Sequence, residues 1–136
     1  MNVDRARAFV KENHRAVLVT RRSDGRPQLS PVLAVVDGDG RIVVSTRETA
    51  MKVRNARGDP AVSLCVMNDR FFGEWLQVDG SAEILSLPEA MDGLVDYYRR
   101  AAGEHDNWDS YRAAMQEERR VLFRVEIERA GPDRSG

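Results

Sequence analysis

Three strand-like runs follow one another near the start of the chain, and this order restricts the fold more than any other feature. The runs cover residues 16–20, 28–36 and 41–45. Asp24-Gly25 separates the first two, and a second Asp-Gly turn at 37–40 separates the next two. Such turns between apolar runs are typical of β-hairpins. A doubly wound α/β fold would alternate strands with helices, so the sequence favours an antiparallel sheet.

The rest of the chain predicts further strands with helices in the gaps between them. We expect strands at 61–67, at 74–78 continuing after a bend at Gly80 into 81–87, and at 121–128. We expect helices at 4–13, 49–57, 88–101 and 108–118. Pro31 suggests an edge or a bulge in the run 28–36. About six antiparallel strands with segregated helices indicate a mainly β (α+β) fold, a small barrel with peripheral helices.

Length and composition set limits on the class of protein. With 136 residues the chain should form one domain, which we place at 1–130, followed by a frayed tail at 131–136. Its 21 basic and 22 acidic residues give a net charge of −1, unlike a nucleic-acid-binding domain. Cys65 has no partner for an internal disulfide, and we expect it in the core. No membrane span or signal peptide is evident, so a cytoplasmic location is the expectation.

The residues of hydrolytic and metal enzymes are not arranged here in a recognisable pattern. His14 and His105 are the only histidines, and neither has a second ligand at metal-binding spacing. Neither belongs to a motif that pairs a histidine with a serine or cysteine nucleophile. We therefore expect no metal and assign no catalytic residue. This pattern agrees with redox chemistry that a cofactor carries.

The segment 45–55 is the strongest candidate for a binding site. Ser45, Thr46 and Arg47 lie where a strand ends, and Lys52 lies in the short helix that follows. Hydroxyl groups, backbone N–H groups and basic side chains could converge there on a small anion such as a cofactor phosphate. The chain has only two lysines against nineteen arginines, which draws attention to Lys52. A solvated basic face is the alternative, although cations at a helix N-terminus are unfavourable without an anion.

Several motifs together resemble the pyridoxamine 5'-phosphate oxidase-like split β-barrel superfamily. They are listed here in chain order: Pro27-Gln28-Leu29-Ser30-Pro31-Val32, Ser45-Thr46, Lys52-Val53-Arg54-Asn55, Asp59-Pro60-Ala61-Val62-Ser63-Leu64 and Gln77-Val78-Asp79-Gly80-Ser81-Ala82-Glu83. The resemblance covers roughly residues 5–130. The short length and the last motif resemble most the actinobacterial branch that uses the deazaflavin coenzyme F420.

This resemblance implies a six-stranded antiparallel split β-barrel of the FMN-binding type, which dimerises with two cofactor sites between its subunits. Ser45, Thr46, Lys52 and Arg47 would hold the cofactor phosphate, with Asn55 nearby. The remaining implied contacts are Gln28, Ser30, Pro31 and Val32 along the ring system, and Trp75 or Gln77 from a neighbouring strand. A basic outer rim from Arg22, Arg54 or Arg57 would favour F420, because F420 carries an acidic polyglutamate tail.

The resulting hypothesis is a homodimeric F420-dependent oxidoreductase that transfers a hydride between the deazaflavin and a small conjugated organic substrate. Two alternatives remain at this point. The same barrel could bind FMN as an oxidase or flavin reductase, or it could be a non-catalytic carrier of F420 or flavin. We expect neither a nucleic acid nor a membrane as a partner.

Overall fold

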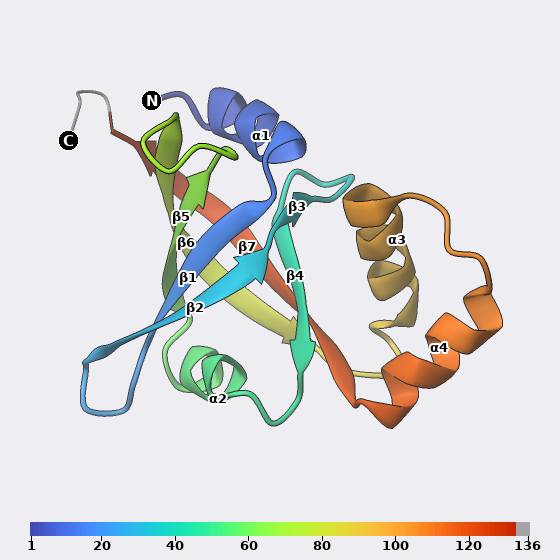
Figure 1. The fold of residues 1–136 in the computed structure, drawn as a ribbon. Helices are drawn as coiled ribbons and strands as arrows, with labels where there is room; N and C mark the ends of the chain where they lie inside the picture. Colours follow the sequence, from blue (N-terminus) through green and yellow to red (C-terminus); the bar gives the residue numbers. More distant parts are fainter. Residues whose placement is uncertain (133–136) are drawn as a thin grey trace.

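One antiparallel sheet curls into a half-barrel, and helices cover its ends and one side (Figure 1). The computed structural model describes residues 1–132. The strands are β1 (Arg15–Arg21), β2 (Pro27–Leu33), β3 (Val35–Val36), β4 (Ile42–Arg47), β5 (Ala61–Met67), β6 (Trp75–Leu85) and β7 (Arg120–Gly131). The helices are α1 (Val3–Glu12), α2 (Met51–Gly58), α3 (Met91–Ala102) and α4 (Trp108–Glu117). The strand order β2-β1-β5-β6-β7-β4-β3 confirms the predicted split-barrel fold with peripheral helices.

Two apolar cores hold the fold together, one inside the curled sheet and one outside it. Ile42 and Val44 of β4 point into the barrel with the fully buried Phe123. Val43, between them, packs against α3 and α4 on the other face, together with Leu122. This alternation is what a strand buried on both faces requires. Figure 1 shows α1 over one end of the barrel and α2 over the opposite end.

The sheet has seven strands instead of the expected six because the run 28–36 divides after Leu33. The division falls at Ala34, whose N–H donates to the His14 carbonyl at 2.7 Å. Pro31 does not interrupt β2, since it lies in an edge strand where its missing N–H can face away from β1.

The bend expected at Gly80 is a bulge within one long strand. The pairing of β6 with β7 shifts register between Asp79 and Gly80. A side chain at Gly80 would collide with the Glu126 carbonyl, so only glycine allows this close approach. β7 extends to Gly131, which therefore does not belong to the tail predicted at 131–136, and residues 133–136 of that tail lie outside the described part of the chain.

Smaller differences concern the start of α3 and the exposure of single residues. α3 begins at Met91, because residue 88 forms a turn in which the Met91 N–H donates to the Pro88 carbonyl. Cys65 is half-buried on the outside of the barrel instead of lying in the core. None of the helices between residues 1 and 132 is both long and apolar enough to cross a membrane.

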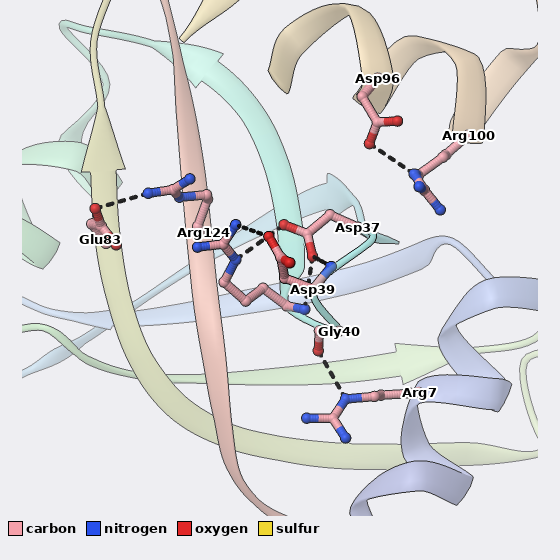
Figure 2. Close-up of polar contacts among 9 residues, drawn as sticks. Arg7, Asp37, Asp39, Gly40, Glu83, Asp96, Arg100 and Arg124 are labelled. Carbon is pink, nitrogen blue, oxygen red and sulfur yellow. Dashed lines mark hydrogen bonds and ion pairs between the residues drawn. The ribbon is translucent and has the colours of Figure 1, made fainter. Parts of the chain in front are cut away.

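Paired charges fix the turn between β3 and β4 (Figure 2). Asp37 accepts hydrogen bonds from the backbone N–H groups of Asp39 and Arg41 and from Arg41 Nε, at 2.9, 3.0 and 3.1 Å. Asp39 also pairs with Arg41, at 2.9 Å. We call Asp37, Asp39 and Arg41 the turn cluster. Arg7 of α1 donates to the Gly40 carbonyl at 2.9 Å, so the helix and the turn hold each other in place.

Candidate functional site

The connection between β4 and α2 leaves backbone donors free at the start of a helix. β4 ends at Arg47 and α2 begins at Met51. Ala50 occupies the N-cap position, and its side chain cannot accept a hydrogen bond from the first turn. Within the described chain, the backbone N–H groups of Thr49, Met51 and Lys52 have no hydrogen-bond partner. Such groups at a helix N-terminus are suited to bind an anion.

Lys52 brings a positive charge to this helix start. Its side chain is half-buried, and burial lowers the pKa of its ammonium group. The positive charge of Arg120 lowers that pKa further. Among residues 1–132 no carboxylate forms an ion pair with Lys52. Two cations that approach without an anion between them repel each other, and a bound anion would remove that repulsion.

The carboxylate of Glu118 forms ion pairs with both Arg47 and Arg120. Glu118 Oε1 lies 2.9 Å from Arg120 Nη2 and 3.6 Å from Arg47 Nη2. The predicted role of Arg47 at the phosphate thus has a competing partner in Glu118. Arg47 and Arg120 lie opposite each other where β4 pairs with β7. The other carboxylate near the start of α2, Glu48, is paired with Arg57. Lys52 is thus left without a carboxylate among the described residues, and this helix start carries a local excess of positive charge.

The predicted contacts on β4 do not share one face. Ser45 and Arg47 lie on the side of α3 and α4, where Ser45 lines a cavity of about 400 Å³. Thr46 points the opposite way, into the barrel, and only 5% of its surface is exposed. The Ser45 hydroxyl is therefore available on the outer face of β4, whereas the Thr46 hydroxyl is buried inside the barrel.

Asn55 and Gln28 are joined inside the end of the barrel. The buried Asn55 amide donates to Gln28 Oε1 at 2.7 Å and to Thr20 Oγ1 at 3.1 Å. The helix that carries Lys52 is thereby tied to both β1 and β2. Ser30 shares the inner face of β2 with Gln28, and Val32 on that face packs against the barrel core.

Three predicted residues lie on the outside of the barrel, away from this cluster. Pro31 belongs to the exposed face of β2. Trp75 and Gln77 lie on the exposed side of β6, and β1 and β5 separate that strand from β2. Trp75 pairs with Met67, the last residue of β5, whereas α2 connects to the first residue of that strand, Ala61. Within one chain, therefore, Trp75 and Gln77 do not meet the start of α2.

A groove with unpaired arginines runs beside α2. It has a volume of about 740 Å³ and lies between the β1–β2 hairpin and α2. Arg21, Arg22 and Arg54 line it, and no ion pair forms to any of them within residues 1–132. We call this the hairpin groove. Arg57, the third residue considered for a basic rim, instead pairs with Glu48 at 2.6 Å and lowers the pKa of that carboxyl group.

Sequence reasoning missed Arg120, and the structure adds Tyr97 to the residues beside Ser45. Arg120 approaches Lys52 only because the ends of β4 and β7 are paired, which no local motif reveals. Tyr97 of α3 donates its hydroxyl to the Leu33 carbonyl at 2.8 Å, and it lines the cavity beside Ser45. In the described residues there is no cluster of three histidine, cysteine or acidic side chains that could hold a metal.

Comparisons with known proteins agree with this architecture. The sequence model of the pyridoxamine 5'-phosphate oxidase family matches residues 3–132. An F420H(2)-dependent biliverdin reductase of Mycobacterium tuberculosis (strain CDC 1551 / Oshkosh) is 31% identical over 128 residues, which cover 93% of this chain and 84% of the reductase.

Solved structures show the same arrangement of strands. A conserved hypothetical protein of Mycobacterium tuberculosis superimposes with a TM-score of 0.76 at 28% identity, over 96% of this chain and 82% of its own. A structure described as an F420 reductase has a TM-score of 0.70 at 22% identity, over 91% of this chain and 94% of its own. The second likeness supports the fold alone.

Proposed function

Because the chain belongs to the pyridoxamine 5'-phosphate oxidase family, we propose that it is an F420-dependent oxidoreductase acting on a conjugated organic compound. The observation that carries this proposal is the excess of positive charge at the start of α2. Lys52 and Arg120 approach each other without a carboxylate for Lys52, next to free backbone donors. A phosphate bound there would satisfy both cations and the helix N-terminus.

The residues around α2 suit the separate parts of this cofactor. Lys52, Arg120 and the N–H groups at the helix start would hold the phosphate. The Ser45 hydroxyl has no hydrogen-bond partner among the described residues, and Ser45 lines the same cavity as Arg120. Gln28, Ser30 and Val32 would lie along the ring at the inner face of β2. Thr46 and Asn55 are buried and would hold β4 and α2 in place around the cofactor. Asn55 would do so through its hydrogen bonds to Thr20 of β1 and Gln28 of β2.

The hairpin groove favours F420 over FMN. Within residues 1–132 the side chains of Arg21, Arg22 and Arg54 form no ion pair, although Asp24 and Asp59 also line the groove. A polyglutamate tail would supply carboxylates to these three arginines. FMN has no such tail, so the groove would have no role in an FMN enzyme. The F420H(2)-dependent biliverdin reductase that is 31% identical to this chain agrees with that choice.

We further propose that two copies assemble through the outside of the barrel. Leu29, Leu33, Val17 and Trp75 share this face across β2, β1 and β6, and the exposed fractions of Leu29 and Leu33 are 62% and 52%. These side chains form an exposed apolar patch on the outside of the sheet, and such patches mark surfaces that contact another protein. A second copy placed on it would bring Trp75 and Gln77 of one subunit toward the β2 strand of the other.

The reaction needs only the cofactor and the acceptor. When bound, reduced F420 would supply a hydride, and with one further proton an acceptor A would become AH₂ while F420 is oxidised. The protein's part is to hold the cofactor, orient the acceptor and exclude water. Cys65 is free, so nothing in the described fold depends on an oxidising compartment, and we propose the cytoplasm as its location.

The experiment that tests this function compares two cofactors and one acceptor. Purified protein is titrated with F420 and with FMN, following the fluorescence of each. Micromolar F420 binding with much weaker FMN binding is the expected result, and the reverse order would replace the proposal with an FMN enzyme. Reduced F420 is then mixed with biliverdin, the substrate of the 31% identical relative. Tight F420 binding with no oxidation by any conjugated acceptor would instead indicate a carrier.

A further inference from the structure

The cavity beside Ser45 has an aromatic wall that the cofactor site does not use. Tyr98, His105, Trp108 and Tyr111 from α3, α4 and the loop between them all contact one another, with ring centroids 5.0 to 5.8 Å apart. Three of these rings, those of Tyr98, His105 and Tyr111, line the cavity. We call it the aromatic cavity. Its volume of about 400 Å³ is within the range of small-molecule sites.

Hydrogen-bond donors lie within this wall. The backbone N–H of Asn107 donates to His105 Nδ1 at 2.9 Å, so in the neutral ring the hydrogen is on Nε2. Neither that Nε2 atom nor the Tyr98 hydroxyl has a partner in the described structure. The Tyr111 hydroxyl, in contrast, donates to the Leu94 carbonyl at 2.7 Å, and burial raises its pKa to about 12. Tyr111 is therefore a fixed part of the wall, while Tyr98 and His105 have donors to offer.

A partly free cation completes the cavity. Arg120 uses Nε and Nη2 to bind Glu118, which leaves its Nη1 group without a partner within residues 1–132. Arg120 also lies near Lys52, so it is common to the cavity and to the proposed phosphate site. Stacking surfaces, two neutral donors and a guanidinium together suit a flat molecule whose oxygen atoms accept hydrogen bonds and gain negative charge on reduction.

We propose that the aromatic cavity is the acceptor subsite and binds a planar conjugated carbonyl compound. The compound would stack against Tyr98 and direct a carbonyl oxygen to His105 Nε2 and Arg120. This rests on the proposed function, because the cavity is next to the site assigned to the cofactor through Ser45 and Arg120. It adds the side on which the acceptor lies and the residues that select it.

Binding of the acceptor can be measured without cofactor, through Trp108. The chain has two tryptophans, so a Trp108→Phe variant serves as the reference: the part of the emission change that this variant loses comes from Trp108, which contacts the cavity wall. Biliverdin and the bicyclic quinone menadione serve as probes, and each is titrated while Trp108 fluorescence is followed. The variants are His105→Phe, which keeps a ring but removes Nε2–H, and Tyr98→Phe. His14→Phe is the matched control, because His14 immediately precedes β1 and does not line the aromatic cavity. Tm shows which variants fold.

We expect at least one probe to quench Trp108 and its Kd to rise about tenfold in His105→Phe and severalfold in Tyr98→Phe, with His14→Phe unchanged. F420 affinity should stay within threefold throughout. The subsite is refuted, even when F420 binds, if neither probe quenches Trp108. It is also refuted if both cavity variants bind the probes as tightly as the unmodified protein does. If F420 fails to bind while the cavity variants still weaken the probes, the proposed function fails and the cavity remains a binding site for conjugated compounds.

Discussion

The turn cluster and the start of α2 are both rich in charge, but they differ in how that charge is matched. In the turn cluster, Arg41 pairs with both Asp37 and Asp39, and Asp37 also accepts two backbone hydrogen bonds. At the start of α2, Glu118 is shared by Arg47 and Arg120, Glu48 is paired with Arg57, and Lys52 has no carboxylate partner in the described chain. The first region is paired within the chain, whereas the second leaves Lys52 unpaired among the described residues, at the place we propose for the phosphate. The comparison separates charges that are paired within the fold from the charge on which the proposed function rests.

The largest effect should come from breaking the paired region. Asp37→Ala removes three hydrogen bonds and leaves the half-buried Arg41 with Asp39 alone. We expect the free energy of unfolding to fall by about 2–3 kcal/mol, measured by chemical denaturation. F420 affinity should not change. Asp39→Ala is the control, because its exposed side chain should contribute less than about 1 kcal/mol. A loss of cofactor affinity in Asp37→Ala would show that the two regions are not independent.

Lys52→Ala should produce the opposite pattern. F420 binding should weaken by about 1–3 kcal/mol, the scale of a lost charged hydrogen bond. The free energy of unfolding without cofactor should not fall, because burial and Arg120 already disfavour the charged ammonium group. Lys11→Ala, at the only other lysine, is the matched control. Unchanged F420 affinity in Lys52→Ala would remove Lys52 from the site.

A smaller effect is expected in the hairpin groove. Arg22→Gln and Arg54→Gln should each weaken F420 binding by about 0.5–1 kcal/mol at low salt, and added salt should reduce the difference. FMN binding should be the same in both variants and in the wild type. Arg57→Gln is a matched control, because Arg57 is engaged with Glu48 outside the groove. Equal losses of binding free energy for F420 and FMN would show that these arginines do not bind the polyglutamate tail.

The smallest effect near neutral pH concerns the ionisation of Lys52. Its pKa in the free protein lies below the usual 10.5, and a bound phosphate would raise it by favouring the ammonium form. The complex therefore binds a proton more tightly, so F420 affinity should fall as pH rises through the pKa of free Lys52. Titrations at increasing pH test this. Lys52→Arg should flatten that fall, since arginine stays protonated, and an equal fall in Lys52→Arg would assign it to another group.

Local patterns were enough to predict the hairpins and the short helix that follows β4. Asp24-Gly25 does join β1 to β2, and the helix containing Lys52 does follow β4. What could not be predicted depends on pairing between distant segments. The approach of Arg120 to Lys52 requires β7 to pair with β4, and the alternation that hides Thr46 and exposes Ser45 follows from which face of β4 meets the barrel core.

Exposure was the least predictable property. Phe71 and Phe72 are 86% and 96% exposed within one chain, so these two large apolar side chains do not belong to its core. Trp75 and Gln77 lie on the outside as well, and their part in the site remains a prediction about a second copy. The sequence pattern around a hydrophobic residue does not distinguish burial within one chain from burial between two chains.

The two prolines of β2 have a consequence for how this protein avoids misassembly. Pro27 and Pro31 are four residues apart in an edge strand, so both direct a position without an N–H group to the same free edge. An incoming strand would find two donors missing from a seven-residue strand and could not extend the sheet there. Prolines in β2 thus discourage fibril-like growth by edge pairing and leave the exposed leucines of the same strand available for contact through the face of the sheet.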